Sequence, residues 1–469
     1  MDHTNTIDTG RTSLAAWRAE AAATLRLALP IVLTQLGWVA MLTTDAIMIG
    51  RLGAIPLAGA TFVLMIFFGV YVFAVGLAMA TAGLAAQAYG ARKPRRVRRV
   101  IRQGLWVMIL VSVPGVGVMA FTEDILIFLR QPPDAVGHAS MYMRTLMWSL
   151  PPAIAFVVLR NFVAALNRPS VALWVMLGAV PFNALLDYAL IYGNFGVPRL
   201  ELFGAGIATT VANTAMFLVL LAIALFARPF RRYSILGRFW RPDWEQFRQI
   251  IRIGMPIAGM MLLESGFFIF AAFMLGWIGT TAVAAHMVAI QVPHITFMVP
   301  IGLSQAATVR VGHAVGRGDA RAAYLAGWTA MAISLAFMAM TSVVILLAAG
   351  ALAGLFLDGN HPGSVEALAL ATTLLFYAAV FQASDGIQAV AAGALRGLND
   401  TAVPMMIAAI CYWGIGFSSG SALGFWAGLG AEGIWMGFVL GLGSAAILLT
   451  WRLTHLTRRR YLPNLLGRT

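Results

Sequence analysis

The sequence predicts an all-α polytopic membrane protein of about twelve transmembrane helices, arranged as two six-helix bundles. Its composition is the first reason. The chain has 469 residues, of which 60% are hydrophobic and only 11% are charged. A water-soluble domain would carry roughly a quarter charged residues. No soluble fold can bury so much apolar surface, so the bilayer is the expected solvent.

The second reason is the length of the apolar runs. Runs of about 20 residues, the length that a helix needs to cross the hydrocarbon, recur along the whole chain. The ten-residue alternating segments of a membrane β-barrel are not visible. The expected spans are 24–48, 55–86, 103–122, 140–164, 170–192, 205–227, 250–276, 283–312, 323–348, 366–395, 401–424 and 430–452.

Charged residues alternate between successive loops. One set of loops holds the basic run from Arg92 to Arg102, the arginines of residues 228–241 and the tail from Arg458 to Arg460. The other set is poor in lysine and arginine. Basic loops stay on the cytoplasmic side, so both termini are expected there, which requires an even number of spans. The net charge of +14 is therefore interpreted as a signal of membrane topology and not as evidence of nucleic-acid binding.

The third reason is an internal repeat. Pro30-Ile31 matches Pro256-Ile257, and Gly76-Leu77 matches Gly302-Leu303 at the same offset. The repeat predicts an N-terminal lobe over 1–227, a basic linker over 228–249 and a C-terminal lobe over 250–469. Because six spans return the chain to the same side, a pseudo-two-fold axis along the membrane normal relates the lobes, and alternating access is expected between them. Prolines inside spans permit bends; the equivalent pair Pro30 and Pro256, together with Pro181, Pro293 and Pro300, are candidates.

Four carboxylic acids lie deep in apolar spans: Asp45, Asp187, Glu264 and Asp385. A buried carboxylate is costly unless it is paired, hydrated or protonated, so these residues are candidates for a proton or ion relay. Asn183 precedes Asp187 by four residues and shares its helix face. No lysine or arginine at comparable depth offers an obvious salt bridge. The alternative is that a given acid only fixes helix packing.

Other chemistry-bearing residues are few. The only cysteine, Cys411, lies in an apolar run, which excludes a disulfide framework and a cysteine-based metal site. His286 and His294 lie two turns apart and could relay protons or simply pack. The chain has no Walker motif, nucleophile elbow or HExxH sequence, so an enzyme or ATPase is not expected.

The pattern resembles the multidrug and toxic compound extrusion (MATE) transporters, and within them the bacterial NorM-like branch. The resemblance covers essentially the whole chain. It rests on the order and spacing of several short motifs, which are Pro30-Ile31 with Thr44-Asp45, Ala86 to Ala91, Leu166 to Pro169, Pro181-Phe182-Asn183 with Asp187, Gly204 to Thr209, Pro256 with Glu264, Ala284-Ala285-His286, and Asp385 with Gly393 to Asn399.

This resemblance implies a secondary antiporter that exports cationic or amphipathic small molecules in exchange for H⁺ or Na⁺, with no other cofactor. It implies a first coupling-cation site at Asp45, Asn183, Asp187 and Thr209, and a second at Glu264 and Asp385, where Na⁺ could bind. Some Na⁺-coupled members of the family place a tyrosine one turn before the aspartate that corresponds to Asp385. In this sequence that position is Phe381, and Tyr377 lies one turn further back. The departure weakens the case for Na⁺ coordination and leaves coupling to H⁺ as an alternative. Further candidates for a substrate cleft or relay are His286, Gln291, Phe381 and Tyr377.

A monomer in the bacterial inner membrane is expected, and nucleic acid is not an expected partner. The alternative is a flippase for lipids or polysaccharide precursors on a related fold, which would need cationic residues deep in the cleft to hold a pyrophosphate. A membrane-embedded enzyme would need a catalytic cluster at one depth, whereas the four acids divide between the halves.

Overall fold

The structure of the protein is a computed structural model, and it describes residues 14–355 and 362–457. The basic tail from Arg458 to Arg460 named above lies outside the described residues. The described residues form helices and no strands, and twelve spans are long and apolar enough to cross a membrane. This confirms the predicted fold class. Helices are the expected outcome because a bilayer offers backbone N–H and C=O groups no other partner.

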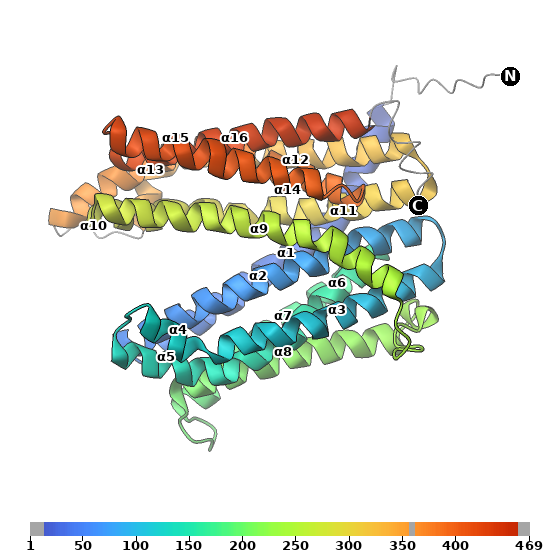
Figure 1. Cartoon of the computed structure of the whole chain (residues 1–469), viewed down its shortest axis with the longest axis horizontal. Coiled ribbons are helices and arrows are strands. Elements are labelled where there is room, and N and C mark those ends of the chain that lie inside the picture. The colour runs from blue at the N-terminus through green and yellow to red at the C-terminus, as the bar shows by residue number, and fades with distance from the viewer. Residues whose placement is uncertain (1–13, 356–361, 458–469) are drawn as a thin grey trace. The chain divides into compact units, whose positions relative to one another are not determined.

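The first half contains eight α-helices and two short 3₁₀ turns (Figure 1). The elements are α1 (Leu14–Gly50), α2 (Ala54–Gly90), α3 (Pro94–Ala120), α4 (Thr122–Phe128), α5 (Pro133–Leu146), η1 (Met147–Ser149), α6 (Leu150–Ala165), α7 (Ser170–Tyr192), α8 (Glu201–Phe226) and η2 (Phe230–Tyr233). The fourth span is thus built from α5, η1 and α6 together.

In the second half, two spans are composite. The elements are α9 (Trp244–Ile278), α10 (Thr280–Thr296), α11 (Met298–Arg317), α12 (Ala320–Gly354), α13 (Pro362–Gly397), α14 (Ala402–Ala408), the π-helix η3 (Ala409–Phe417), α15 (Ser418–Ser421), the π-helix η4 (Ala422–Trp426) and α16 (Gly430–Thr457). The eighth span comprises α10 and α11, and the eleventh runs from α14 to η4.

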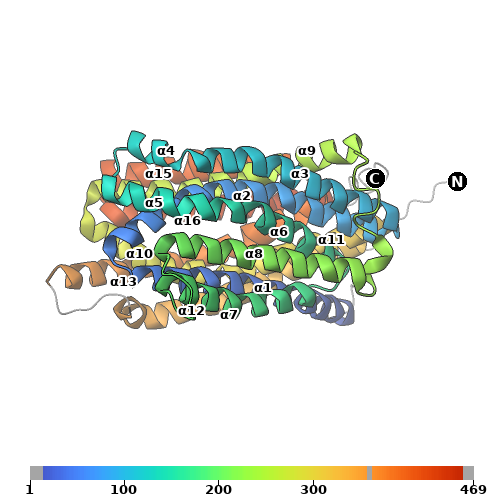
Figure 2. The same ribbon diagram turned by 90° about the horizontal axis from the view of Figure 1, so that it is seen from below.

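The chain divides into two compact units that exchange the beginnings of their first helices. The first-half unit is Leu33–Ala258, and the second-half unit comprises the described residues up to Val32 and from Gly259 onward. In the first-half unit α2 packs on α3 and α6, and α7 runs along α8 (Figure 2). In the second-half unit α13 packs against α11, α12 and α16. The unit boundaries follow Pro30 and Pro256 within a few residues.

Two repeat-equivalent glycines permit this exchange. A Cβ atom on Gly76 of α2 would stand 2.7 Å from the backbone nitrogen of Ala258 in α9. A Cβ atom on Gly302 of α11 would stand 3.1 Å from the backbone nitrogen of Val32 in α1. Only glycine allows backbones to approach so closely, as at small-residue contacts between membrane helices. The repeat that the sequence reveals is therefore expressed as a reciprocal helix contact.

An ion pair also fastens the start of α1 to the second-half unit. The Arg310 guanidinium of α11 donates to both Glu20 carboxylate oxygens, at 2.9 Å through Nε and 2.5 Å through Nη2. The two side chains are only 22% and 13% exposed. Such bidentate geometry is the strong form of an arginine–carboxylate pair.

Prolines differ in their effect on the helices. Helices α1, α7 and α9 continue through Pro30, Pro181 and Pro256. The eighth span is broken instead: α10 ends at Thr296, and α11 begins two residues later. The Pro300 ring would collide with the carbonyl of the residue four positions earlier, which is Thr296. The break therefore coincides with the carbonyl that the Pro300 ring would meet.

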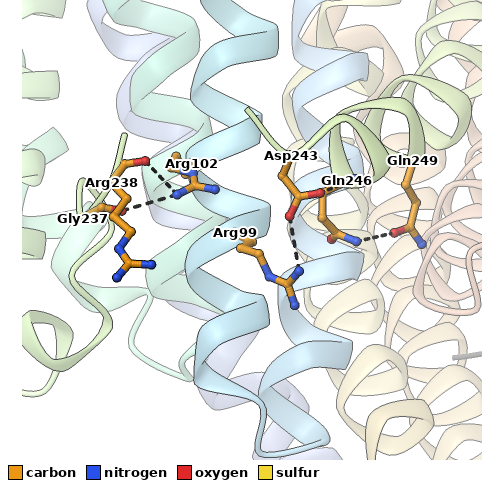
Figure 3. Close-up of polar contacts among 7 residues, drawn as sticks. All are labelled: Arg99, Arg102, Gly237, Arg238, Asp243, Gln246 and Gln249. Atoms are coloured by element: carbon orange, nitrogen blue, oxygen red, sulfur yellow. Dashed lines mark hydrogen bonds and ion pairs between the residues drawn. The ribbon is translucent and has the colours of Figure 1, made fainter. Parts of the chain in front are cut away.

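The linker between the halves folds back against the start of α3 (Figure 3). Arg99 pairs with Asp243 at 3.3 Å, and Arg102 donates to the carbonyls of Gly237 and Arg238 at 3.4 and 2.9 Å. Asp243 also accepts from the backbone N–H of Gln246 in the first turn of α9. The basic run of α3 therefore holds the linker backbone, in addition to its expected role in topology.

Candidate functional site

The first carboxylate cluster lies in the first-half unit, where the structure brings together Asp45 of α1, Asn183 and Asp187 of α7, and Thr209 of α8. Asn183 and Asp187 are fully buried, and Asp45 and Thr209 are each 6% exposed. Four residues separate Asn183 from Asp187, so both side chains lie on one face of α7. The spacing in the sequence thus corresponds to a real juxtaposition.

A single amide bridges the two acids of this cluster. The Asn183 NH₂ group donates to Asp45 at 2.5 Å and to Asp187 at 2.8 Å. Ionised carboxylates only accept hydrogen bonds, so the amide must turn its nitrogen toward them. Thr209 has one O–H group, which is closer to the Ala205 carbonyl (3.0 Å) than to Asp45 (3.4 Å). Its contribution to the cluster is therefore secondary.

The first cluster has spare acceptor atoms. Asp187 Oδ1 and Asn183 Oδ1 are buried and have no hydrogen-bond donor. Buried polar atoms are almost always paired, so two acceptors without a donor in one cluster call for a proton, a cation or a water molecule. The sequence analysis missed Tyr142 of α5, which is 1% exposed and hydrogen-bonds to Thr209. A tyrosine within the predicted span 140–164 was the available signal, because the hydroxyl of a tyrosine in a span usually finds a hydrogen-bond partner.

The second cluster lies in the second-half unit and repeats the same chemistry on different elements. The Gln388 NH₂ group of α13 donates to Glu264 of α9 at 2.9 Å and to Asp385 at 3.1 Å. Glu264 is half-buried and Asp385 is 5% exposed. The sequence analysis did not identify Gln388. Its position three residues after Asp385 on the same helix face was the signal that could have found it.

Tyr412 fixes the orientation of the bridging amide in the second cluster. Its hydroxyl, carried by η3, donates to Gln388 Oε1 at 2.7 Å, and both side chains are almost fully buried. The amide oxygen is thereby occupied, and the NH₂ group faces the two acids. In the first cluster the corresponding oxygen, Asn183 Oδ1, has no donor. The two clusters therefore share a bridge but differ in how firmly it is held.

Replacing Tyr412 with Phe is expected to weaken the apparent affinity for the coupling cation about three- to tenfold, because one buried hydrogen bond is worth roughly 0.5–1.5 kcal/mol. The measurement is the ion dependence of substrate exchange in proteoliposomes. Tyr188→Phe, at a residue that is 45% exposed, is the matched control. An unchanged ion dependence in Tyr412→Phe would contradict the role given to this hydroxyl.

A cation has few protein ligands at either cluster. Hard cations such as Na⁺ take oxygen ligands, and each cluster offers two carboxyl groups. Within residues 14–355 and 362–457 no group of three or more His, Cys, Asp and Glu side chains is placed to hold a metal. Contrary to the expectation that no cation lies near, Arg396 of α13 interacts electrostatically with Glu264 and also donates to Ser304 Oγ at 2.6 Å. The two carboxyl groups of each cluster are sufficient to bind a proton, whereas Na⁺ would need water ligands in addition.

The four remaining candidates all lie in the second-half unit. His286 and Phe381, 3% and 1% exposed, contact the Trp435 ring with centroids 5.6 and 5.9 Å away. Tyr377 donates to Glu432 at 3.0 Å, and Gln291 is exposed. His286 and Phe381 thus belong to a buried aromatic cluster of the second-half unit. Their participation in a substrate cleft or relay stays a prediction.

The two carboxylate clusters are not repeat equivalents. Under the repeat that aligns Pro30 with Pro256, Asp45 corresponds to Ala271 and Glu264 corresponds to Trp38. The first cluster uses the fifth span, and the second uses the tenth. The halves share an architecture but carry their acids at positions that do not correspond, so the clusters can differ in function.

Comparison with known proteins gives one consistent result. The sequence profile of the MatE family matches residues 30–189 and 256–420, one match in each half. A probable multidrug resistance protein NorM of Bradyrhizobium diazoefficiens is 46% identical, with 94% of each chain covered. A multidrug resistance protein NorM of Burkholderia vietnamiensis is 37% identical over 92% of this chain and 93% of its own.

Solved structures agree on the fold. The crystal structure of the eukaryotic MATE transporter AtDTX14 superposes with a TM-score of 0.85 at 20% identity, covering 96% of this chain and 99% of that one. The crystal structure of a MATE protein in the straight conformation gives a TM-score of 0.84 at 21% identity, covering 96% and 97%.

Proposed function

Since the chain belongs to the MatE family of membrane transporters, in its NorM-like branch, we propose that it exports cationic or amphipathic small molecules in exchange for H⁺ or Na⁺. It is a multi-pass membrane transporter rather than an enzyme. The single observation that carries the coupling proposal is the pair of amide-bridged carboxylate clusters. Carboxyl groups held out of water can take up a proton or cation and release it when their surroundings change.

The proposed cycle uses mutual exclusion. A cationic substrate and the incoming cation both neutralise the same carboxylates, so binding of one favours release of the other. A ligand shifts a conformational equilibrium only through its different affinity for the two states. Alternating access then follows if the charged and the neutralised clusters favour opposite openings. Asp187 Oδ1, which lacks a donor, is the atom best suited to receive a proton in the first cluster.

We further propose that the protein is a monomer of the bacterial inner membrane with both termini in the cytoplasm. The loop-charge pattern supports this orientation. The flippase alternative requires cations for a pyrophosphate. The clusters described here are carboxylate-rich, which favours the cation antiporter.

The test is exchange in inverted vesicles. A fluorescent cationic dye is added, and a pH gradient or a Na⁺ gradient is imposed separately. The proposal expects dye accumulation under at least one gradient and collapse of the accumulation when that gradient is dissipated. Dye movement that does not depend on either gradient would overturn the proposed ion coupling. Lipid scrambling in the absence of dye transport would favour the flippase.

A further inference from the structure

The linker between the halves displays an aromatic and basic segment, Arg238 to Trp244, whose sequence is Arg-Phe-Trp-Arg-Pro-Asp-Trp. Its backbone is held by α3: Arg102 donates to the carbonyls of Gly237 and Arg238, and Trp106 Nε1 donates to the Phe239 carbonyl at 3.0 Å. These contacts fix the backbone of the segment against α3, while the side chains of Arg238, Trp240, Arg241 and Trp244 remain exposed.

The depth of the segment follows from α3. A helix needs about 20 residues to cross the hydrocarbon, so counting back from Ala120, where α3 ends, the apolar layer begins near residue 101. Arg102 therefore lies at the polar boundary, and Trp106 lies one turn further in. The linker residues bonded to them, from Gly237 to Phe239, occupy the same level. The segment thus lies at headgroup level and not in open water.

The exposed side chains suit that level. Trp240 is 82% exposed and Trp244 is 71% exposed, and the Trp240 ring meets the Trp106 ring edge-on at 6.2 Å. Arg238 and Arg241 are exposed on either side of Trp240, and the Arg238 guanidinium points away from Arg102 in Figure 3. Among the described residues, no acid pairs with either of these two guanidinium groups. Tryptophan favours the membrane interface, and arginine binds phosphate in a bidentate manner.

We propose that Arg238, Trp240 and Arg241 form a binding site for the headgroup of an anionic phospholipid in the leaflet that the linker faces. The two guanidinium groups would hold the phosphodiester, and the Trp240 ring would lie against the glycerol and upper acyl region. The one acid within the segment, Asp243, is paired with Arg99 at 3.3 Å, so its charge is partly neutralised. This site is independent of the transport proposal and requires only that the chain is embedded in a bilayer.

The test is native mass spectrometry of the purified full-length protein, titrated with phosphatidylglycerol or with phosphatidylcholine of the same acyl chains. The wild type is expected to prefer phosphatidylglycerol in its first lipid adduct by about 25-fold, since each of the two arginines near an anionic surface contributes a factor of roughly five. The double variant Arg238→Gln/Arg241→Gln should reduce that preference to less than about threefold. Trp240→Ala should weaken the adduct several-fold.

The matched control is the double variant Arg51→Gln/Arg130→Gln, which removes two exposed arginines from loops at the other ends of the spans. It should keep the wild-type preference. The proposal is overturned if the linker variant retains the preference, or if the control loses as much. It is also overturned if soluble glycerol phosphate displaces the adduct, because the site would then bind free phosphate.

Discussion

Replacing Asp45 with Asn is expected to slow ion-driven export about 30-fold or more while the protein stays folded. The oxygen of the introduced amide would still accept from Asn183, so packing is preserved, but the cluster would lose the charge that a coupling cation neutralises. Hydrogen bonds to charged groups are worth roughly 1.5–3 kcal/mol, which sets the size of the effect. The measurement is the initial rate of dye exchange in proteoliposomes with equal protein content.

The second cluster offers a parallel comparison. Glu264→Gln and Asp385→Asn should slow exchange similarly if both clusters carry coupling ions, and leave it intact if only the first does. Asp124→Asn, at an exposed residue in α4, is the control and should exchange at the wild-type rate. Wild-type rates in Asp45→Asn, Glu264→Gln and Asp385→Asn together would contradict the site assignment.

Replacing Gly76 with Val is expected to destabilise the protein by about 1–3 kcal/mol and lower its Tm by several degrees, because the new side chain meets the α9 backbone. The measurement is thermal unfolding of the purified protein in detergent. Gly302→Val should behave alike, since its neighbour is the α1 backbone.

Gly178→Val is the matched control for this pair. Gly178 also lies inside a helix, but a Cβ atom there would meet no atom within 4 Å. It therefore carries the same change in helix propensity without the close contact. Equal Tm values for Gly76→Val and Gly178→Val would contradict the reciprocal helix contact described here.

The fold could be predicted in detail because its main determinants are local. Apolar length, loop charge and a constant repeat offset depend on composition and order, and twelve spans followed from them. The break in the eighth span also has a local cause, the Pro300 ring. The exchange of the first parts of α1 and α9 between the compact units could not be predicted, because it depends on which helices Gly76 and Gly302 contact.

The candidate site was partly visible in the sequence. Acids in apolar runs stand out, and the spacing of Asn183 and Asp187 placed two polar groups on one helix face. Gln388 was missed although its spacing from Asp385 was visible, and Tyr412 was missed because a tyrosine in a span carries no sign of which residue on another helix it contacts. Arg396 was missed as a neighbour of Glu264 for the same reason: sequence position gives depth along a helix but not proximity across helices.

The functional weight of each cluster also depends on three-dimensional contacts. The amide of Asn183 keeps an oxygen without a donor, whereas that of Gln388 is held by Tyr412. This asymmetry makes the first cluster the more adaptable ligand set. The second cluster is the more rigid. A cation that binds there must either disturb the Tyr412 hydrogen bond or use the carboxylate oxygens of Glu264 and Asp385 that do not accept from Gln388.

The most direct test of the central claim, that substrate and coupling cation exclude each other at these carboxylates, is cation release on substrate binding. A cationic dye is added to purified protein in weakly buffered detergent solution, with a pH indicator or a Na⁺ indicator present. The account predicts stoichiometric release of protons or Na⁺ by the wild type and its loss in Asp45→Asn or Glu264→Gln. Tight dye binding by the wild type with no release of either cation would contradict it.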